Sequence, residues 1–437
     1  MSLRSNATKN CFCAALSCYT SFMKTVFGLL LSLSFAFAQA DGGRIVFVTP
    51  EGQLATVAPD GAELRVLSPP SSSESFQFPA WSPDGSSIAA TGADAEGGFV
   101  KVLEDAEGAE AQELYRSRGE PPFYLYWSPD GESVSFLANH ATEGIGLHIA
   151  SSAEDDRVLA TGSPFYWQWS ASGEELFIHS GFTGEGSRLG FISRAEDGLS
   201  ENLAPPGRFQ SPGISPSGKY LAYASDGVRG PQVIIQSDER TQEALRREVA
   251  HQGVVALSWS PVADELALMS PEAESPFAFG PIQLLNADTG LLEPLTDNRA
   301  VGFFWSPDGR YIVYFAPLQG GGSGDAAEVL PETLPETLQF AAQRPALLGI
   351  HLIDVAERSD ELIAGVVPSP QFVQQFLPFF DQYALSHSIW SSASDALVLP
   401  IIDTEARSLS VATVSLDGTV TTIAEGDMPF WQPATEP

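Results

Sequence analysis

Short apolar segments alternate with tight-turn sequences from Arg44 to the C-terminal end of the chain. A clear example is the apolar segment 123–127, which is followed by the turn Ser-Pro-Asp-Gly at 128–131 and by a second apolar segment at 134–137. In such a turn the proline sets φ, the aspartate bonds the backbone ahead of it, and the glycine accepts a positive φ. Apolar segments on both sides of this turn predict a β-hairpin.

The turn and the tryptophan before it recur along the chain as the phrase Trp-Ser-Pro-Asp-Gly. Intact copies stand at 81–85, 127–131 and 305–309, altered copies at 169–173, 214–218, 259–263 and 390–394, and the fragment Trp-Gln-Pro at 431–433. Successive copies begin 41 to 46 residues apart, apart from one gap of 85 residues between 305 and 390. A period in the 40s with strand-type sequence predicts a β-propeller.

Each period contains further strand-like segments after the turn. Behind Trp81 we expect strands at 87–91, 99–103 and 112–115, and behind Trp259 at 265–269, 282–286 and 293–295. Four strands make one blade, and blades bury their faces by stacking around an axis. The repeat tryptophans end the innermost strands, where large rings fill the space between neighbouring sheets. They are Trp81, Trp127, Trp169, Trp259, Trp305, Trp390 and Trp431.

The two ends of the repeat region complement each other. Residues 44–48 match the strand after a turn but lack the strand before it, and residues 428–431 match that missing strand. We therefore expect the C-terminal strand to pair with the N-terminal one and close the ring. The predicted fold is all-β, a single propeller of eight four-stranded blades. Seven blades remain the alternative, if one altered copy has collapsed.

The first 40 residues differ from the rest. Residues 23–40 have a basic start, an apolar core and the ending Ala38-Gln-Ala40, which predicts a secretory signal cleaved after Ala40. We expect residues 1–22 to be a non-structural leader, from a mis-assigned start before Met23 or a long signal, and residues 41–437 to form the propeller. All three cysteines lie in the leader, so no disulfide is expected. No later segment has the length of a membrane span, and we expect a periplasmic or secreted protein.

The chain is strongly acidic, with a formal net charge of −33. Cleavage after Ala40 would remove three basic residues and no acid, leaving 19 basic against 55 acidic residues, or −36. Such a surface repels nucleic acids and anionic lipids, so a nucleic-acid partner is not expected. The charge favours solubility and a monomer, and a cationic partner is the alternative explanation.

The full Trp-Ser-Pro-Asp-Gly phrase, followed by an Ile-Ala-Ala or Ile-Val-Tyr strand, resembles the repeat of TolB-like β-propeller proteins. The resemblance covers nearly all of residues 44–433. Relatives include the periplasmic interaction module TolB, the propellers of prolyl-oligopeptidase-type peptidases, and oligogalacturonate lyases. TolB has an additional N-terminal domain and a six-bladed ring, so the resemblance implies a TolB-like repeat protein that is not TolB itself. The hydrolase domain of the peptidases has no counterpart in this sequence.

Residues with catalytic chemistry do not form a pattern. The six histidines are expected in different blades, without a pair at metal-ligand spacing, and only His387 is expected on an inner strand, 385–390. A catalytic metal usually takes about three protein ligands, so we expect no metal site. No nucleophile elbow, calcium loop or phosphate-binding loop occurs either. We accordingly expect no catalytic residue and no cofactor.

Two further features bear on binding. The long gap contains an insertion at 319–345, expected to be a surface loop or an arm over one mouth of the ring, and an aromatic segment at 370–383. A second aromatic cluster lies on two adjacent inner strands. The candidate binding residues are Tyr124, Tyr126, Tyr166, Trp167, Phe379, Phe380, Tyr383 and His387. Packing between blades is the alternative role for these rings.

These observations favour a non-catalytic binding protein whose partner is a protein or a cell-envelope polymer. The alternative is a polysaccharide-active enzyme, lyase- or hydrolase-like, that uses the funnel of the ring. Clustered His, Asp or Arg side chains in one mouth would favour the enzyme. A mouth lined by small and apolar groups, with aromatic side chains around it, would favour the binding protein.

Overall fold

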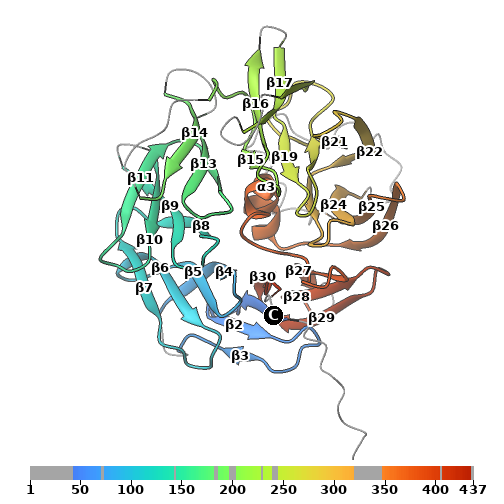
Figure 1. Cartoon of the computed structure of the whole chain (residues 1–437). Helices are drawn as coiled ribbons and strands as arrows, with labels where there is room; N and C mark the ends of the chain where they lie inside the picture. Colours follow the sequence, from blue (N-terminus) through green and yellow to red (C-terminus); the bar gives the residue numbers. More distant parts are fainter. Residues whose placement is uncertain are drawn as a thin grey trace, which may run out of the picture. The chain divides into compact units, whose positions relative to one another are not determined.

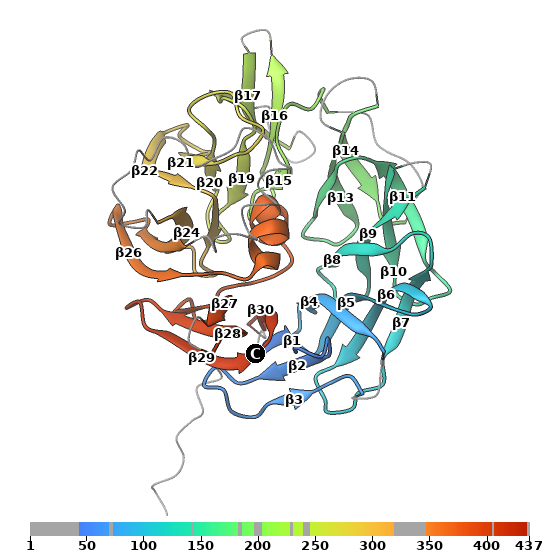
Figure 2. The same cartoon turned by 180° about the vertical axis from the view of Figure 1, so that it is seen from behind.

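Eight antiparallel sheets follow one another around a closed ring, as the repeat predicted (Figures 1 and 2). The structure is a computed structural model. It describes residues 43–69, 73–141, 144–181, 186–195, 203–227, 230–238, 245–318, 347–403 and 406–434. They belong to one unit, Gly43–Pro437. The predicted leader, signal and insertion at 319–345 lie outside the described residues.

The first four blades are numbered here in chain order from the first intact repeat. Blade 1 contains β4 (Ser75–Trp81), β5 (Ser87–Asp94), β6 (Gly97–Glu104) and β7 (Gln112–Ser117). Blade 2 contains β8 (Pro122–Trp127), β9 (Val134–His140), β10 (Gly144–Ala150) and β11 (Arg157–Gly162). Blade 3 contains β12 (Phe165–Trp169), β13 (Glu175–Ser180) and β14 (Arg188–Ser193). Blade 4 contains β15 (Gly213–Ile214), β16 (Tyr220–Gly227), β17 (Gly230–Ser237) and β18 (Arg246–Ala250).

The remaining blades complete the circle. Blade 5 contains β19 (Ala256–Trp259), β20 (Glu265–Met269), β21 (Gly280–Asn286) and β22 (Leu292–Ala300). Blade 6 contains β23 (Gly302–Trp305), β24 (Tyr311–Pro317), β25 (Leu348–Asp354) and β26 (Ser359–Val366). Blade 7 contains β27 (Ala396–Asp403), β28 (Ser408–Ser415) and β29 (Val420–Glu425). Blade 8 contains β30 (Asp427–Trp431), β1 (Ile45–Val48), β2 (Leu54–Val57) and β3 (Arg65–Val66).

The predicted closure of the ring is confirmed. In blade 8 the last strand pairs with the first, with Ile45 opposite Trp431 and Val46 opposite Phe430. The Nε1 of Trp81 in blade 1 donates to the carbonyl of Phe430 at 3.2 Å. The first and last strands of the described region therefore form one sheet, which is tied to the next blade.

Two blades depart from the predicted four strands. Within the described residues, blades 3 and 7 have three strands each. In blade 7 the inner strand expected at 385–390 is reduced to a single bridge between Trp390 and Leu397. The reason is that the residues before Trp390 form helical turns and approach the blade from inside the ring, so His387 does not lie on a strand.

The repeat phrase folds as its residues predict. In the first copy the hydroxyl of Ser82 donates to Oδ1 of Asp84 at 2.6 Å, and the N–H of Gly85 donates to the carbonyl of Ser82 at 2.9 Å. Gly85 has φ of 68°, which glycine adopts without strain. The hydrogen bond from Ser82 is the main cause that lowers the pKa of Asp84. Each turn is thus held by its own side chains.

Several of the repeat tryptophans join neighbouring blades. The indole Nε1 of Trp127 donates to the carbonyl of Ala80 at 3.0 Å, and Ala80 lies on the inner strand of the preceding blade. Trp305 and Trp390 bond the preceding inner segment in the same manner, each at 3.2 Å. The repeat thus explains both the hairpin and the bond to the next sheet.

The predicted aromatic segment lies inside the ring (Figures 1 and 2). It forms three short helical turns, η1 (Phe372–Phe376), η2 (Leu377–Phe379) and α3 (Phe380–Tyr383). The rings of Phe372 and Phe376 stack at 5.1 Å, and Phe376 also packs 5.5 Å from Phe304 on β23 and from Phe430 on β30. We call residues 372–387 the plug. No helix among the described residues is both long enough and apolar enough to cross a membrane.

Candidate functional site

The plug is anchored by the side chain of Gln382 on α3. Its Oε1 accepts the N–H of Trp167 on β12 at 2.9 Å, and its Nε2 donates to the carbonyl of the same residue at 2.9 Å. Nε2 also donates to the hydroxyl of Tyr124 at 3.0 Å. One carboxamide therefore takes the place of a neighbouring strand for the inner strand of blade 3.

The residue before Gln382 in the plug, Asp381, carries a buried carboxyl group. Its side chain is buried, and its oxygens accept the N–H groups of Ser211 at 3.3 Å and Gln382 at 3.0 Å. Burial raises the pKa of Asp381 to about 7, while these hydrogen bonds act in the opposite direction. A carboxyl group at the centre of the ring thus gains or loses its proton near neutral pH.

The imidazole of His387 ends the plug. Its Nε2 lies 3.3 Å from the carbonyl of Phe78, which only accepts, so the proton resides on Nε2. Its Nδ1 then accepts from the hydroxyl of Ser386 at 2.6 Å. Burial lowers the pKa of His387 to about 3, so the ring is neutral at physiological pH. An imidazole this weakly basic is poorly matched to general-base catalysis near neutrality.

A cavity of about 400 Å³ opens where the plug meets the repeat turns of blades 4 to 6. We call it the mouth cavity. Prolines, repeat tryptophans and small polar residues of the blades contribute to its wall, and plug residues form its floor. The wall includes Pro212, Pro216, Trp259, Pro261, Trp305 and Pro307. The floor includes Asp381, Ala384, Leu385 and His387.

The mouth cavity is largely apolar and carries one ionisable acid. Among its lining residues, only Asp381 and His387 titrate, and no lysine or arginine is present. Because His387 is neutral, any charge in the cavity at physiological pH comes from Asp381. Concave, apolar sites with a few polar groups are typical ligand-binding sites, and this volume lies in their usual range.

The predicted binding residues lie mostly in the core of the ring instead of on an open surface. Tyr124, Trp167, Tyr383 and His387 form one buried cluster, in which the ring of Tyr124 is 5.2 Å from Trp167 and 5.0 Å from Tyr383. Of the other predicted residues, Tyr166 and Phe380 are buried, Tyr126 is half-buried and Phe379 is exposed. His387 alone also lines the mouth cavity.

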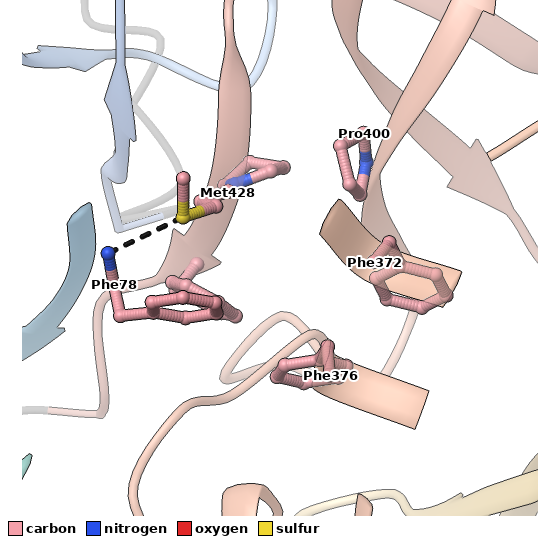
Figure 3. Close-up of a pocket in the computed structure, with 7 residues that line it drawn as sticks. Phe78, Phe372, Phe376, Pro400 and Met428 are labelled. Carbon is pink, nitrogen blue, oxygen red and sulfur yellow. Dashed lines mark hydrogen bonds between the residues drawn. The ribbon is translucent and has the colours of Figure 1, made fainter. Parts of the chain in front are cut away.

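A second, apolar pocket lies between blades 1, 7 and 8 and the plug (Figure 3). The N–H of Phe78 donates to Sδ of Met428 at 3.3 Å, and both residues have a positive φ, 46° and 51°. Pro400, Phe372 and Phe376 complete most of the wall. The volume is about 10 Å³, room for about one water molecule, so this pocket does not admit an organic ligand.

Two histidines that were expected in different blades lie side by side in blade 2. Nε2 of His140, at the end of β9, is 2.9 Å from Nε2 of His148 on β10. Nδ1 of His148 is 2.9 Å from Oδ1 of Asp156. The expectation of separate blades was wrong because both residues belong to one hairpin. The alternation Gly144-Ile-Gly-Leu-His148 was the available signal, since it puts two glycines and a histidine on one face of a strand.

The other histidines do not join this pair. His179 stacks on Phe209 with ring centroids 4.0 Å apart, and burial lowers its pKa to about 4. His351 lies 3.5 Å from Asp360 and stacks on Tyr314. In the part of the chain that the structure describes, no group of three or more His, Cys, Asp or Glu side chains is arranged to hold a metal.

Comparison with known proteins shows likeness in fold alone. No family model matches the chain, and no curated protein matches it. A crystal structure of the eukaryotic initiation factor is 12% identical, with a TM-score of 0.51, and the match covers 90% of this chain and 98% of that one. A structure from a study of two prolyl endopeptidases is 11% identical, with a TM-score of 0.51, over 81% of this chain and 50% of that one.

TolB from Acinetobacter baumannii is 14% identical, with a TM-score of 0.38, and the match covers 90% of this chain and 67% of that one. The protein is a β-propeller. Its structural similarity to TolB, to oligogalacturonate lyase and to the prolyl endopeptidase is distant. Similarity at this level of sequence identity shows the fold alone, and a propeller fold does not select a function.

Proposed function

We propose that this protein is an exported, non-catalytic TolB-like propeller, distinct from TolB itself, that binds a protein or a cell-envelope polymer at the mouth cavity. The observation that carries the proposal is the lining of that cavity. Proline, tryptophan and small polar residues surround it, with Asp381 as its one acid. Aromatic and proline walls offer rigid apolar contact area to an extended chain.

The ionisable groups of the cavity support binding over catalysis. General acid and base catalysis needs groups positioned to exchange protons with a substrate. His387 is a weak base, with a pKa of about 3, and its two nitrogens are occupied by Ser386 and Phe78. Asp381 accepts two backbone N–H groups, and no histidine or arginine bonded to its side chain is found in the described part of the chain. We therefore favour a role for Asp381 in orienting a bound basic or polar group.

A filled-cavity variant tests the proposal. Leu385 lies on the floor of the cavity and is only half-buried, so Leu385→Arg places a long side chain in the cavity without removing an inter-blade hydrogen bond. The matched control is Leu64→Arg, because Leu64 is 58% exposed and is not among the residues that line the cavity. Both variants should keep the melting temperature of the wild type.

The measurement is capture of partners from cell-envelope extracts by immobilised residues 41–437. We expect the wild type and Leu64→Arg to retain the same partner and Leu385→Arg to lose it. Equal capture by all three proteins would contradict binding at this cavity. Release of new reducing or unsaturated sugar ends from envelope polysaccharides, abolished in Asp381→Asn, would favour the enzyme alternative.

A further inference from the structure

The histidine pair of blade 2 depends on the absence of side chains on the neighbouring strand. Along β10, Gly144, Gly146 and His148 occupy alternate positions and share one face of the sheet, and Gly144 pairs with His140 on β9. A Cβ atom at Gly146 would lie 2.4 Å from Nε2 of His140. The imidazole of His140 can therefore lie across this part of the strand and reach His148.

Carboxylates face the outer nitrogens of both rings. Nδ1 of His148 is 2.9 Å from Asp156, and Nδ1 of His140 is 3.8 Å from Oε1 of Glu120. Since a carboxylate only accepts hydrogen bonds, the contact with Asp156 places the proton of His148 on Nδ1 and leaves a lone pair on its Nε2. Glu120 lies beyond hydrogen-bond distance, so in the neutral pair Nε2 of His140 donates to Nε2 of His148 at 2.9 Å. A cation that displaces this one proton would meet a lone pair from each ring.

The rings are also held in place. His148 stacks on Phe136, with ring centroids 4.8 Å apart, and meets the edge of Tyr115 at 5.1 Å. The side chain of His148 is 4% exposed, whereas that of His140 is 16% exposed. One imidazole is therefore fixed, and the other leaves a path from solvent.

The geometry points to a site for a divalent late transition-metal ion, Cu²⁺ or Ni²⁺, bound by the Nε2 atoms of His140 and His148. A histidine that donates Nδ1–H to a carboxylate and offers Nε2 outward is the usual arrangement of a metal ligand. Metal–nitrogen bonds of about 2.0–2.1 Å would span the 2.9 Å separation at an angle of about 90°. This is the angle between neighbouring ligands in tetragonal sites, which nitrogen and oxygen ligands form with Cu²⁺ or Ni²⁺.

Such a site has two protein ligands, and water would complete the coordination. This agrees with the finding that the described residues contain no group of three or more metal-binding side chains. Glu120 and Asp156 supply two negative charges that offset the charge of the ion. The site lies at blade 2, separate from the residues that line the mouth cavity, and does not depend on the proposed function.

Titration of the untagged protein with CuSO₄ or NiCl₂ tests the site. We expect one ion per chain, a visible d–d absorption band, and nitrogen hyperfine splitting in the electron paramagnetic resonance spectrum of the Cu²⁺ form. Affinity should fall by about tenfold or more in His140→Gln and His148→Gln, and by about 10- to 100-fold in Asp156→Asn. The control is His351→Gln, because His351 also lies beside an aspartate but lacks a second imidazole bonded to it.

The decisive variant is Gly146→Ala, which keeps both imidazoles. The new methyl group would displace the ring of His140 toward solvent, so metal affinity should fall while the melting temperature stays near that of the wild type. Unchanged affinity in Gly146→Ala, or an equal loss in His351→Gln, would overturn the proposal. The proposal would also be overturned if the wild-type protein bound neither Cu²⁺ nor Ni²⁺ through nitrogen. In that case nitrogen NMR of the imidazoles would show one proton shared between the two rings.

Discussion

The side-chain amide of Gln382 bonds both backbone groups of Trp167, although the two residues are 215 positions apart in the sequence. An inner strand of a propeller ordinarily leaves one edge facing the central channel, with its N–H and C=O groups unpaired. Here the plug provides hydrogen-bond partners for the N–H and C=O groups of one residue on that edge. The contact thus fixes the plug and supplies partners to both backbone groups of one residue on the inner edge of blade 3.

Gln382→Ala should destabilise the protein strongly. The change leaves the N–H and C=O of Trp167 and the hydroxyl of Tyr124 without this partner in a buried region, at about 1–3 kcal/mol for each unsatisfied group. We expect the free energy of unfolding in urea to fall by about 3 kcal/mol or more. Gln374→Ala is the matched control, since Gln374 is exposed on the same segment. A loss of equal size in the control would show that the amide contact is not the cause.

Asp381 should make stability depend on pH. In the folded protein its pKa is about 7, above the ordinary value of 3.8, so between these values the folded state holds a proton that the unfolded chain has lost. Its contribution to stability is therefore fully present at low pH and is lost as pH rises from about 4 to about 7.

Asp381→Asn should remove this dependence, because asparagine stays neutral. The unfolding free energy of the wild type should fall relative to that of Asp381→Asn as pH rises. Between pH 4 and pH 8 this relative loss should be on the order of 3 kcal/mol. Urea unfolding at several pH values measures it, with Asp60→Asn in an exposed turn as control. A constant difference across this range would mean that the carboxyl titrates normally.

Removal of residues 428–437 should open the ring. It deletes most of β30, the pairing with β1, and the buried side chains of Phe430 and Trp431. We expect the melting temperature to fall by about 10 °C or more, given about 3–5 kcal/mol for each large buried ring. Differential scanning calorimetry measures the shift, and a chain that lacks only residues 435–437 is the control. If the chain that lacks residues 428–437 melted at the same temperature as the full-length chain, closure of the ring by β30 would be contradicted.

The tryptophan bonds between blades can be isolated by a pair of conservative changes. Trp127→Phe removes the hydrogen bond to Ala80, whereas Trp431→Phe removes an indole N–H that has no partner among the described residues. Both changes also lose part of a buried ring. We expect Trp127→Phe to lower the unfolding free energy by about 1 kcal/mol more than Trp431→Phe. Equal losses would indicate that ring packing, and not the hydrogen bond, joins these blades.

The ring itself could be predicted from the sequence because its information is local and repeated. Each Trp-Ser-Pro-Asp-Gly copy specifies a turn, and the strand at 428–431 matches the one missing before residues 44–48. The plug could not be predicted in the same way. Phe372 and Phe376 suggested a helical face, but the bond that positions the plug joins Gln382 to a residue in a distant blade.

The histidine pair shows a second limit. His140 and His148 are separated by Ala-Thr-Glu and a glycine-rich strand, so the hairpin between them carries no turn sequence of the repeat type. Their contact depends on strand register and on the missing side chain at Gly146. Register across a hairpin of this kind is set by pairing in the folded sheet, which spacing along the chain does not reveal.

The pairing of Ile45 with Trp431 also has a consequence for biosynthesis. The strand β1 has no neighbour on one edge until residues 427–431 have been synthesised and have left the ribosome. Seven blades can form progressively, but the eighth is assembled only at that point, so a nascent chain without these residues remains an open arc. A product truncated before β30 would expose the edge of β1 to pairing with another molecule.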